Sequence, residues 1–258
     1  MSQTGESVGA LFRAGNLAAA VDAANAAVRK APADIAARVL LAELLVFAGN
    51  LERADVILDA ASQVEPEAAV VVAEFRQLRR DGRVPEFLGE PTDTQRLQLA
   101  ALVALRAGDM AEALKLSGAA ELSRPHVAGT GESGAFDDFR DADDLCAGSF
   151  EVLTTTGKYY WIPTERVMNI DFHPPKRARD LMWRRATMSV RDGPDGDVYL
   201  PAIYGSEDAA LTDALKFGRE TDWVEDGGPV RGVGQRLFLV GEEAVGIMDL
   251  GTLEFGTE

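Results

Sequence analysis

The chain has 258 residues, of which 47% are hydrophobic, and its formal net charge at pH 7 is −16. This composition supports a substantial core and argues against a largely disordered chain, while the acidic surface repels nucleic-acid phosphates. No apolar run is long enough to span a bilayer, residues 1–6 lack the pattern of a secretory signal, and Cys146 is the single cysteine, so we expect a cytoplasmic protein without membrane insertion.

The N-terminal part repeats one motif three times, in which a glycine is followed by a polar residue. The glycines are Gly15, Gly49 and Gly108, and the first two lie 34 residues apart. At fixed distances after each glycine stand two alanines and a proline, namely Ala20, Ala27 and Pro32, then Ala54, Ala61 and Pro66, then Ala113, Ala120 and Pro125. This period is typical of tetratricopeptide-like helix–turn–helix repeats. An ordinary alanine-rich bundle does not predict the shared register.

The chemistry of the motif supports the repeat interpretation. Glycine adopts the left-handed conformation that ends a helix. The next residue, Asn16, Asn50 or Asp109, can cap the following helix. Apolar residues recur every three or four positions, which predicts helices over about 8–14, 17–30, 35–47, 51–64, 67–80, 92–107 and 110–122. We expect the three helical hairpins to lie side by side. The prolines and glycine of 83–91 predict a loop, in which Phe87 and Leu88 pack between helices.

The composition changes after the third repeat. Residues 125–142 are rich in glycine and acidic residues and are predicted to be a linker, and a short helix is expected over about 143–153. Strand patterns follow at 158–163, 167–172, 186–191, 198–202, 221–224, 235–240 and 244–250, with a hairpin turn at 192–197 and a short helix within 208–217. We predict an α+β fold, with a tetratricopeptide-like domain over 1–124 and a small, mainly antiparallel α+β domain over 143–258.

Residue types that are typical of catalytic or metal sites are sparse. The histidines are His126 and His173, and no cluster of further histidines or cysteines accompanies either. The glycine-rich segment 228–236 contains Arg231 and Arg236 but lacks the lysine and hydroxyl pair of a phosphate loop. We therefore expect no catalytic residue, metal or cofactor. Tyr159 and Trp161 share one face of a predicted strand, either as core residues or as a binding surface.

Four segments of this chain resemble the ImpE/TagJ family of type VI secretion accessory proteins. They are 40–55, 85–91, 157–163 and 232–236, and they occur in the family's order, whereas 124–135 departs most from it. The resemblance implies a non-enzymatic cytoplasmic adaptor that binds the N-terminal helix of the small contractile-sheath subunit and is linked to the AAA+ unfoldase ClpV. The candidate partner-binding residues are Phe87, Leu88, Tyr159, Trp161, Arg231 and Arg236.

Stacked helix pairs form a groove that suits an amphipathic helix, so we expect the partner on the repeat domain or at its junction with the sheet. One alternative is an enzymatic or ligand-binding module in the C-terminal domain, which would use Trp161, His173, Arg231 and Arg236. Another alternative is a scaffold for other partners, such as a self-associating dimer. The acidic charge either keeps the protein soluble or attracts basic partners.

Overall fold

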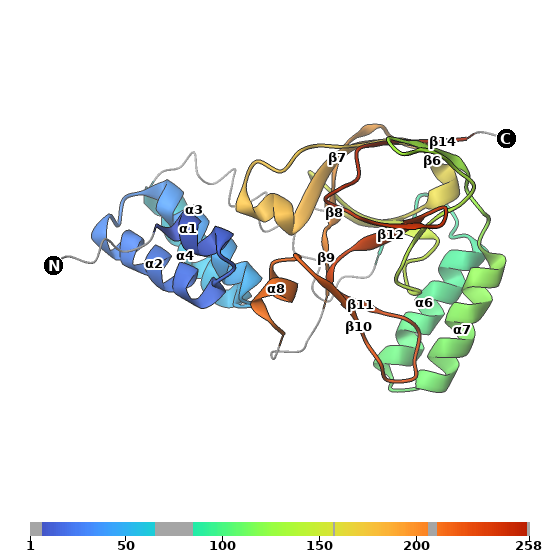
Figure 1. Cartoon of the computed structure of the whole chain (residues 1–258), viewed down its shortest axis with the longest axis horizontal. Helices are drawn as coiled ribbons and strands as arrows, with labels where there is room; N and C mark the ends of the chain where they lie inside the picture. The colour runs from blue at the N-terminus through green and yellow to red at the C-terminus, as the bar shows by residue number, and fades with distance from the viewer. Residues whose placement is uncertain (1–6, 65–84, 157, 206–210, 257–258) are drawn as a thin grey trace.

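The computed structural model describes residues 7–64, 85–156, 158–205 and 211–256. Helices α1–α4 lie at the left end of the molecule, strands of the main sheet lie at the upper right, and the hairpin of α6 and α7 lies below them at the lower right (Figure 1). The α+β class is therefore confirmed. Within the described ranges, no helix combines the length and apolar character that crossing a membrane requires. The predicted helix over 67–80 lies outside the described residues.

The predicted repeat turns are confirmed in detail. The N-terminal helices are α1 (Val8–Arg13), α2 (Leu17–Lys30), α3 (Ile35–Phe47) and α4 (Leu51–Val64). Gly15 and Gly49 have φ values of 77° and 73°, in the left-handed region. The Asn16 side chain accepts a hydrogen bond from Ala19 N (3.0 Å), and Asn50 accepts one from Arg53 N (3.2 Å). Each turn therefore ends one helix and caps the next with two adjacent residues.

The third repeat forms the same hairpin but lies elsewhere. It consists of α6 (Asp93–Arg106) and α7 (Met110–Ser123), with Gly108 at φ 80° and Asp109 capping α7. This hairpin does not lie beside α1–α4 (Figure 1), so the expectation that three hairpins lie side by side is wrong for the described helices. The buried face of α6 carries Gln95 and Gln98, which suit a polar backbone surface better than an apolar helix.

Hydrogen bonds show why α6 packs on the sheet domain. Gln95 Nε2 donates to the carbonyl oxygen of Trp161 at 3.0 Å. The Gln98 carboxamide, in the orientation that satisfies its neighbours, accepts from the backbone N–H groups of Ala147 and Gly148, both at 3.0 Å. Buried amide side chains need such partners, and the backbone beside these strands supplies them.

The main sheet has eight antiparallel strands in the order β2-β1-β14-β6-β7-β8-β4-β5. These strands are β1 (Gly129–Gly131), β2 (Gly134–Phe136), β4 (Ser149–Thr154), β5 (Tyr159–Pro163), β6 (Val167–Phe172), β7 (Trp183–Val190), β8 (Gly196–Pro201) and β14 (Thr252–Phe255). Two three-stranded sheets are formed by β10 (Thr221–Trp223), β11 (Gly232–Gln235) and β9 (Ile203–Tyr204), and by β13 (Glu243–Gly246), β12 (Leu237–Val240) and β3 (Phe139–Asp141). Short helices are η1 (Thr164–Arg166), η2 (Ala178–Leu181) and α8 (Asp213–Lys216).

Two expectations for the region after the repeats need correction. Residues 125–142, predicted to be a linker, include β1, β2 and β3, which pair with strands of two sheets. The predicted helix over 143–153 is wrong, because this stretch forms turns followed by β4. Strand β4 is buried on both faces and includes Glu151, so it lacks the alternation of apolar and polar residues that marks a half-exposed strand. The predicted β7–β8 hairpin is confirmed.

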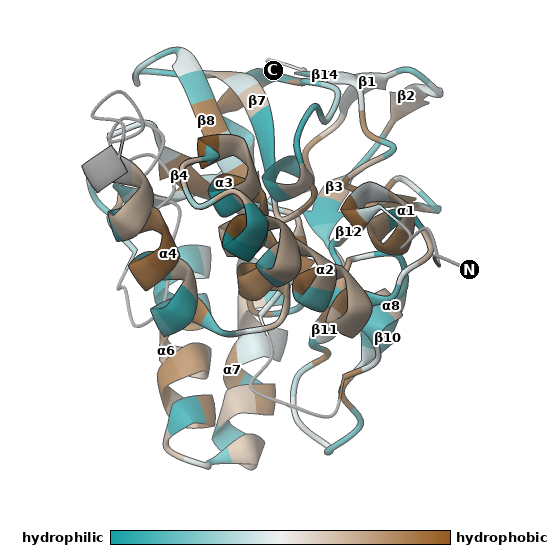
Figure 2. Cartoon of the chain, turned by 90° about the vertical axis from the view of Figure 1, so that its left-hand side faces the viewer, coloured by the Kyte–Doolittle hydropathy of each residue, from teal (hydrophilic) through white to brown (hydrophobic). Residues whose placement is uncertain are grey.

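One hydrophobic cluster joins the repeat helices to the sheet. It combines residues of α2, α3 and α4 with Trp161, Trp183 and Tyr199 from the strands, and with Phe217 next to α8. Viewed from the side of the repeats, α2, α3 and α4 lie in front of the sheet (Figure 2). The Phe217 ring meets Phe12 and Phe47 at centroid distances of 5.0 and 5.2 Å.

Polar contacts hold the same junction. Asp213 Oδ2 accepts from Leu17 N at 2.9 Å, and the Arg219 guanidinium donates to the carbonyl oxygens of Phe12 and Arg13 at 2.6 and 3.1 Å. A Cβ atom added to Gly15 would lie 2.8 Å from Arg219 Nη1. Gly15 therefore provides the space for Arg219 as well as the left-handed turn.

We predict that Phe217→Ala weakens this junction. The substitution removes two aromatic contacts and leaves a cavity between the helices and the sheet, so the free energy of unfolding falls by about 3 kcal/mol. Urea denaturation followed by circular dichroism measures this loss. Phe217→Leu, which retains most of the apolar volume, serves as the control, and an unchanged midpoint for Phe217→Ala would show that the ring does not hold the junction.

Candidate functional site

A buried network of charged residues connects β3 and β4 with the residue that joins β11 to β12. Arg236, which lies between β11 and β12, is 1% exposed. Its Nη2 donates to Glu151 Oε2 on β4, and its Nη1 lies 3.5 Å from Asp141 Oδ2 on β3. One cation therefore lies between two buried carboxylates that come from different sheets, and its charge offsets part of theirs.

Aromatic residues extend the network on both sides. The Tyr159 hydroxyl donates to Glu151 Oε1 and accepts from Trp161 Nε1 at 2.8 Å. The Tyr204 hydroxyl donates to Asp141 Oδ1 at 2.7 Å, and the Arg236 guanidinium carbon lies 5.2 Å from the centroid of the Tyr204 ring. The polar atoms of these aromatic side chains are thus used inside the protein.

Burial raises the pKa of two carboxyl groups in and beside this network. Loss of hydration raises the pKa of Asp141, although Arg236 opposes the effect. Burial and the neighbouring Asp141 together raise the pKa of Asp143 to about 7. Asp143 accepts hydrogen bonds from Leu145 N and Gly232 N at 2.9 and 3.1 Å, so it joins its own turn to the start of β11.

The structure brings together four of the six predicted partner-binding residues. Tyr159, Trp161 and Arg236 belong to the buried network, and Phe87 packs edge-on against Trp161 at 6.5 Å between centroids. Leu88 packs against a different hydrophobic cluster, which includes buried residues of strands β4, β6 and β7. The sixth residue, Arg231, forms an ion pair with Asp226. Contact between these residues and a partner stays a prediction. Tyr159, Trp161 and Arg236 are buried in this structure.

The sequence-based site omitted the network's acids. Glu151, Asp141 and Asp143 were not predicted, and neither was Tyr204. Glu151 lies between Phe150 and Val152, and a charge flanked by apolar residues is the signal that could have identified a buried ion pair. The residues of the alternative ligand-binding module are not brought together, since Arg231 and His173 lie outside this network.

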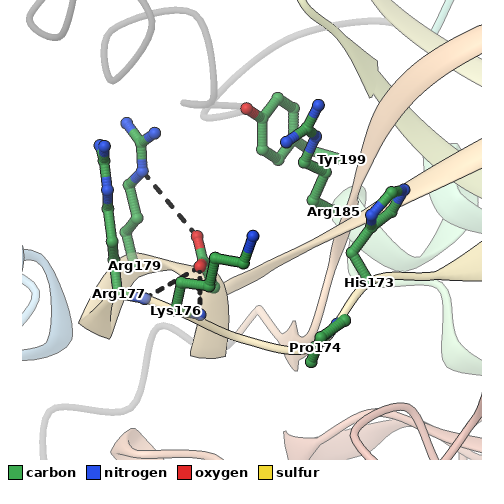
Figure 3. Close-up of a pocket in the computed structure, with 8 residues that line it drawn as sticks. His173, Pro174, Lys176, Arg177, Arg179, Arg185 and Tyr199 are labelled. Carbon is green, nitrogen blue, oxygen red and sulfur yellow. Dashed lines mark hydrogen bonds and ion pairs between the residues drawn. The ribbon is translucent and has the colours of Figure 1, made fainter.

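The second feature is a pocket of about 280 Å³ on the sheet domain, which we call the basic pocket (Figure 3). It is lined by His173, Pro174, Lys176, Arg177, Arg179, Asp180, Arg185 and Tyr199. These residues come from the loop that follows β6, from η2, and from the neighbouring strands β7 and β8. Across the part of the chain that the structure describes, no three histidine, cysteine or acidic residues are grouped to hold a metal ion.

Hydrogen bonds fix the shape of the basic pocket. Asp180 Oδ2 accepts from the backbone N–H groups of Lys176 and Arg177 at 2.7 and 2.9 Å. On the other side, Arg185 Nη2 donates to Asp197 Oδ2 at 2.5 Å. The carboxylates of Asp180 and Asp197 thus position the loop and one guanidinium.

We predict that Arg236→Met strongly destabilises the protein. The substitution leaves two buried carboxylates without their cation, so the free energy of unfolding falls by about 3 kcal/mol or more. Chemical denaturation measures the change. The matched control is Arg231→Met, which removes a partly exposed ion pair and lowers stability by less than about 1 kcal/mol. Equal losses in the two variants would contradict the central role of Arg236.

Comparisons with known proteins agree with this architecture. A family model described as "ImpE protein" matches residues 133–254, and a tetratricopeptide repeat model matches residues 11–73. The chain is similar to the "Type VI secretion system accessory component TagJ" of Pseudomonas aeruginosa, with 31% identity over 257 residues, covering 95% of this chain and 89% of the relative.

A solved structure supports the same relationship. The crystal structure of protein VPA1032 from Vibrio parahaemolyticus superposes with a TM-score of 0.88 at 26% sequence identity. The match covers 97% of this chain and 98% of the other. From its similarity to TagJ over nearly its whole length, the chain belongs to the ImpE/TagJ family of type VI secretion accessory proteins.

Proposed function

We propose that this accessory protein is a cytoplasmic, non-enzymatic adaptor that binds the N-terminal helix of the small sheath subunit and links the sheath to the ClpV unfoldase. The observation that carries the proposal is its 31% identity, over 95% of the chain, to a protein named as a type VI secretion system accessory component. The tetratricopeptide-like helices support a role in binding another protein, because such repeats offer extended helical surfaces.

Exposed apolar residues favour the α6–α7 hairpin as the binding surface. Val103 on α6 is 60% exposed, and Leu114 and Leu122 on α7 are 48% and 91% exposed. Leu114 and Leu122 lie about two helical turns apart, which places them on one side of α7. An amphipathic helix would cover these side chains with its apolar face, and apolar burial would supply the affinity.

The repeat helices offer a weaker alternative surface. Among the described side chains of α1–α4, the exposed large apolar residue is Val56 on α4, which is 64% exposed. A single exposed apolar side chain is common on any protein surface, whereas three on one hairpin are more typical of an interface. The acidic charge of the chain favours a partner helix with basic residues beside its apolar face.

Calorimetry with a peptide of the small sheath subunit's N-terminal helix tests this proposal. We expect the wild-type chain to bind, and Leu114→Asp/Leu122→Asp to weaken binding by about tenfold or more, or about 1.4 kcal/mol. Val56→Asp introduces the same charge on α4 and should leave the affinity unchanged. Charged residues at a desolvated apolar contact oppose binding, which is the reason for the expected difference.

Each outcome identifies a different error. Absence of binding to the wild-type chain would contradict the adaptor function itself. Loss of binding in Val56→Asp alone would move the interface to the repeat helices. The link to ClpV is examined by gel filtration of ClpV with the sheath subunit, with and without this protein, and co-elution that does not depend on the protein would contradict the link.

A further inference from the structure

The basic pocket serves neither the buried network nor the proposed helix-binding surface, and its charge is unusual for this chain. Four permanently cationic side chains line it, from Lys176, Arg177, Arg179 and Arg185, although the whole chain has a net charge of −16. We propose that the basic pocket binds a small molecule through a phosphate group.

The arrangement of the cations supports an anionic ligand. The side chains of Arg177 and Arg179 extend in the same direction from the loop and η2, while Arg185 and Tyr199 lie across from them (Figure 3). Arg179 is 6% exposed, so the surrounding protein holds its side chain in place. Guanidinium groups bind phosphate oxygens through two parallel hydrogen bonds, and several of them around one space suit a single phosphate.

Among the described residues, cations outnumber acids around the basic pocket. Two acids adjoin the four cations, since Asp180 lines the pocket and Asp197 pairs with Arg185. The third nearby acid is Glu43 on α3, whose burial raises its pKa to about 7 against the opposing effect of Arg179 and Arg177. The lining cations thus outnumber the described acids beside them, and a phosphate monoester, which carries about two negative charges near neutral pH, matches several cations better than one carboxylate does.

The loop is organised before a ligand arrives. Asp180 fixes the backbone of Lys176 and Arg177, and Pro174 and Pro175 restrict the preceding backbone. Little backbone entropy is therefore lost when a ligand binds. The volume of about 280 Å³ accommodates a small compound, and the Tyr199 ring and Pro174 provide apolar contact for the group that bears the phosphate.

Titration calorimetry on the full-length chain tests the proposal with inorganic phosphate, pyrophosphate, adenosine monophosphate and citrate at constant ionic strength. The test variant is Lys176→Gln/Arg177→Gln, in which both altered side chains are exposed. The control is Arg106→Gln, at the exposed end of α6 away from η2. We expect phosphate compounds to bind the wild type and the control equally, and the test variant to bind about tenfold more weakly or worse.

The ligand series separates the possible sources of the phosphate. Tighter binding of adenosine monophosphate than of inorganic phosphate would indicate a phosphorylated organic molecule, and equal binding would indicate free phosphate as the ligand. No heat with any phosphate compound, equal binding by the test variant and the control, or citrate binding as tightly as pyrophosphate would overturn the proposal. None of these results depends on the sheath peptide, so the adaptor function is tested independently.

Discussion

The sheet domain depends on one buried cation. Arg236 is buried between β11 and β12, and its guanidinium faces Glu151 of the eight-stranded sheet and Asp141 of a three-stranded sheet. Charges are costly to remove from water, so each of these groups is tolerated because the others are present. The hydroxyl groups of Tyr159 and Tyr204 donate hydrogen bonds to Glu151 and Asp141, and Trp161 donates one to Tyr159. The relative position of the sheets is thus specified by polar geometry as well as by apolar packing.

This network gives a structural role to residues that the sequence analysis proposed as partner-binding residues. Trp161 and Arg236 belong to segments that resemble the ImpE/TagJ family, yet both are buried and hydrogen-bonded or ion-paired inside the protein. Their place in the family pattern is explained by the architecture of the domain. Exposed apolar side chains lie elsewhere, among them Val103, Leu114 and Leu122 on α6 and α7, and the basic pocket lies on another part of the sheet domain.

The sequence predicted features that depend on neighbouring residues and missed features that depend on residues far apart in the chain. The turns at Gly15, Gly49 and Gly108 depend on hydrogen bonds between residues a few positions apart, so local sequence predicted them correctly. The position of α6 depends on bonds from Gln95 and Gln98 to backbone about 50 residues or more away, which no local pattern reveals.

Buried charge caused the remaining errors in the fold and the site. Glu151 interrupts the apolar pattern of β4, and Asp141 ends β3 in a stretch that its acidic composition made resemble a linker. The basic pocket was missed for a different reason. Lys176, Arg177 and Arg179 are close in sequence. Arg185 and Tyr199 are brought to the pocket by the pairing of β7 with β8.

The contact of Arg219 with the end of α1 has a consequence for the order in which the protein matures during synthesis. Helices α1–α4 leave the ribosome before residues 213–219 exist, so the carbonyl groups of Phe12 and Arg13 and the rings of Phe12 and Phe47 first face water or a chaperone. The nascent repeats therefore reach their final packing after α8 and Arg219 have been translated.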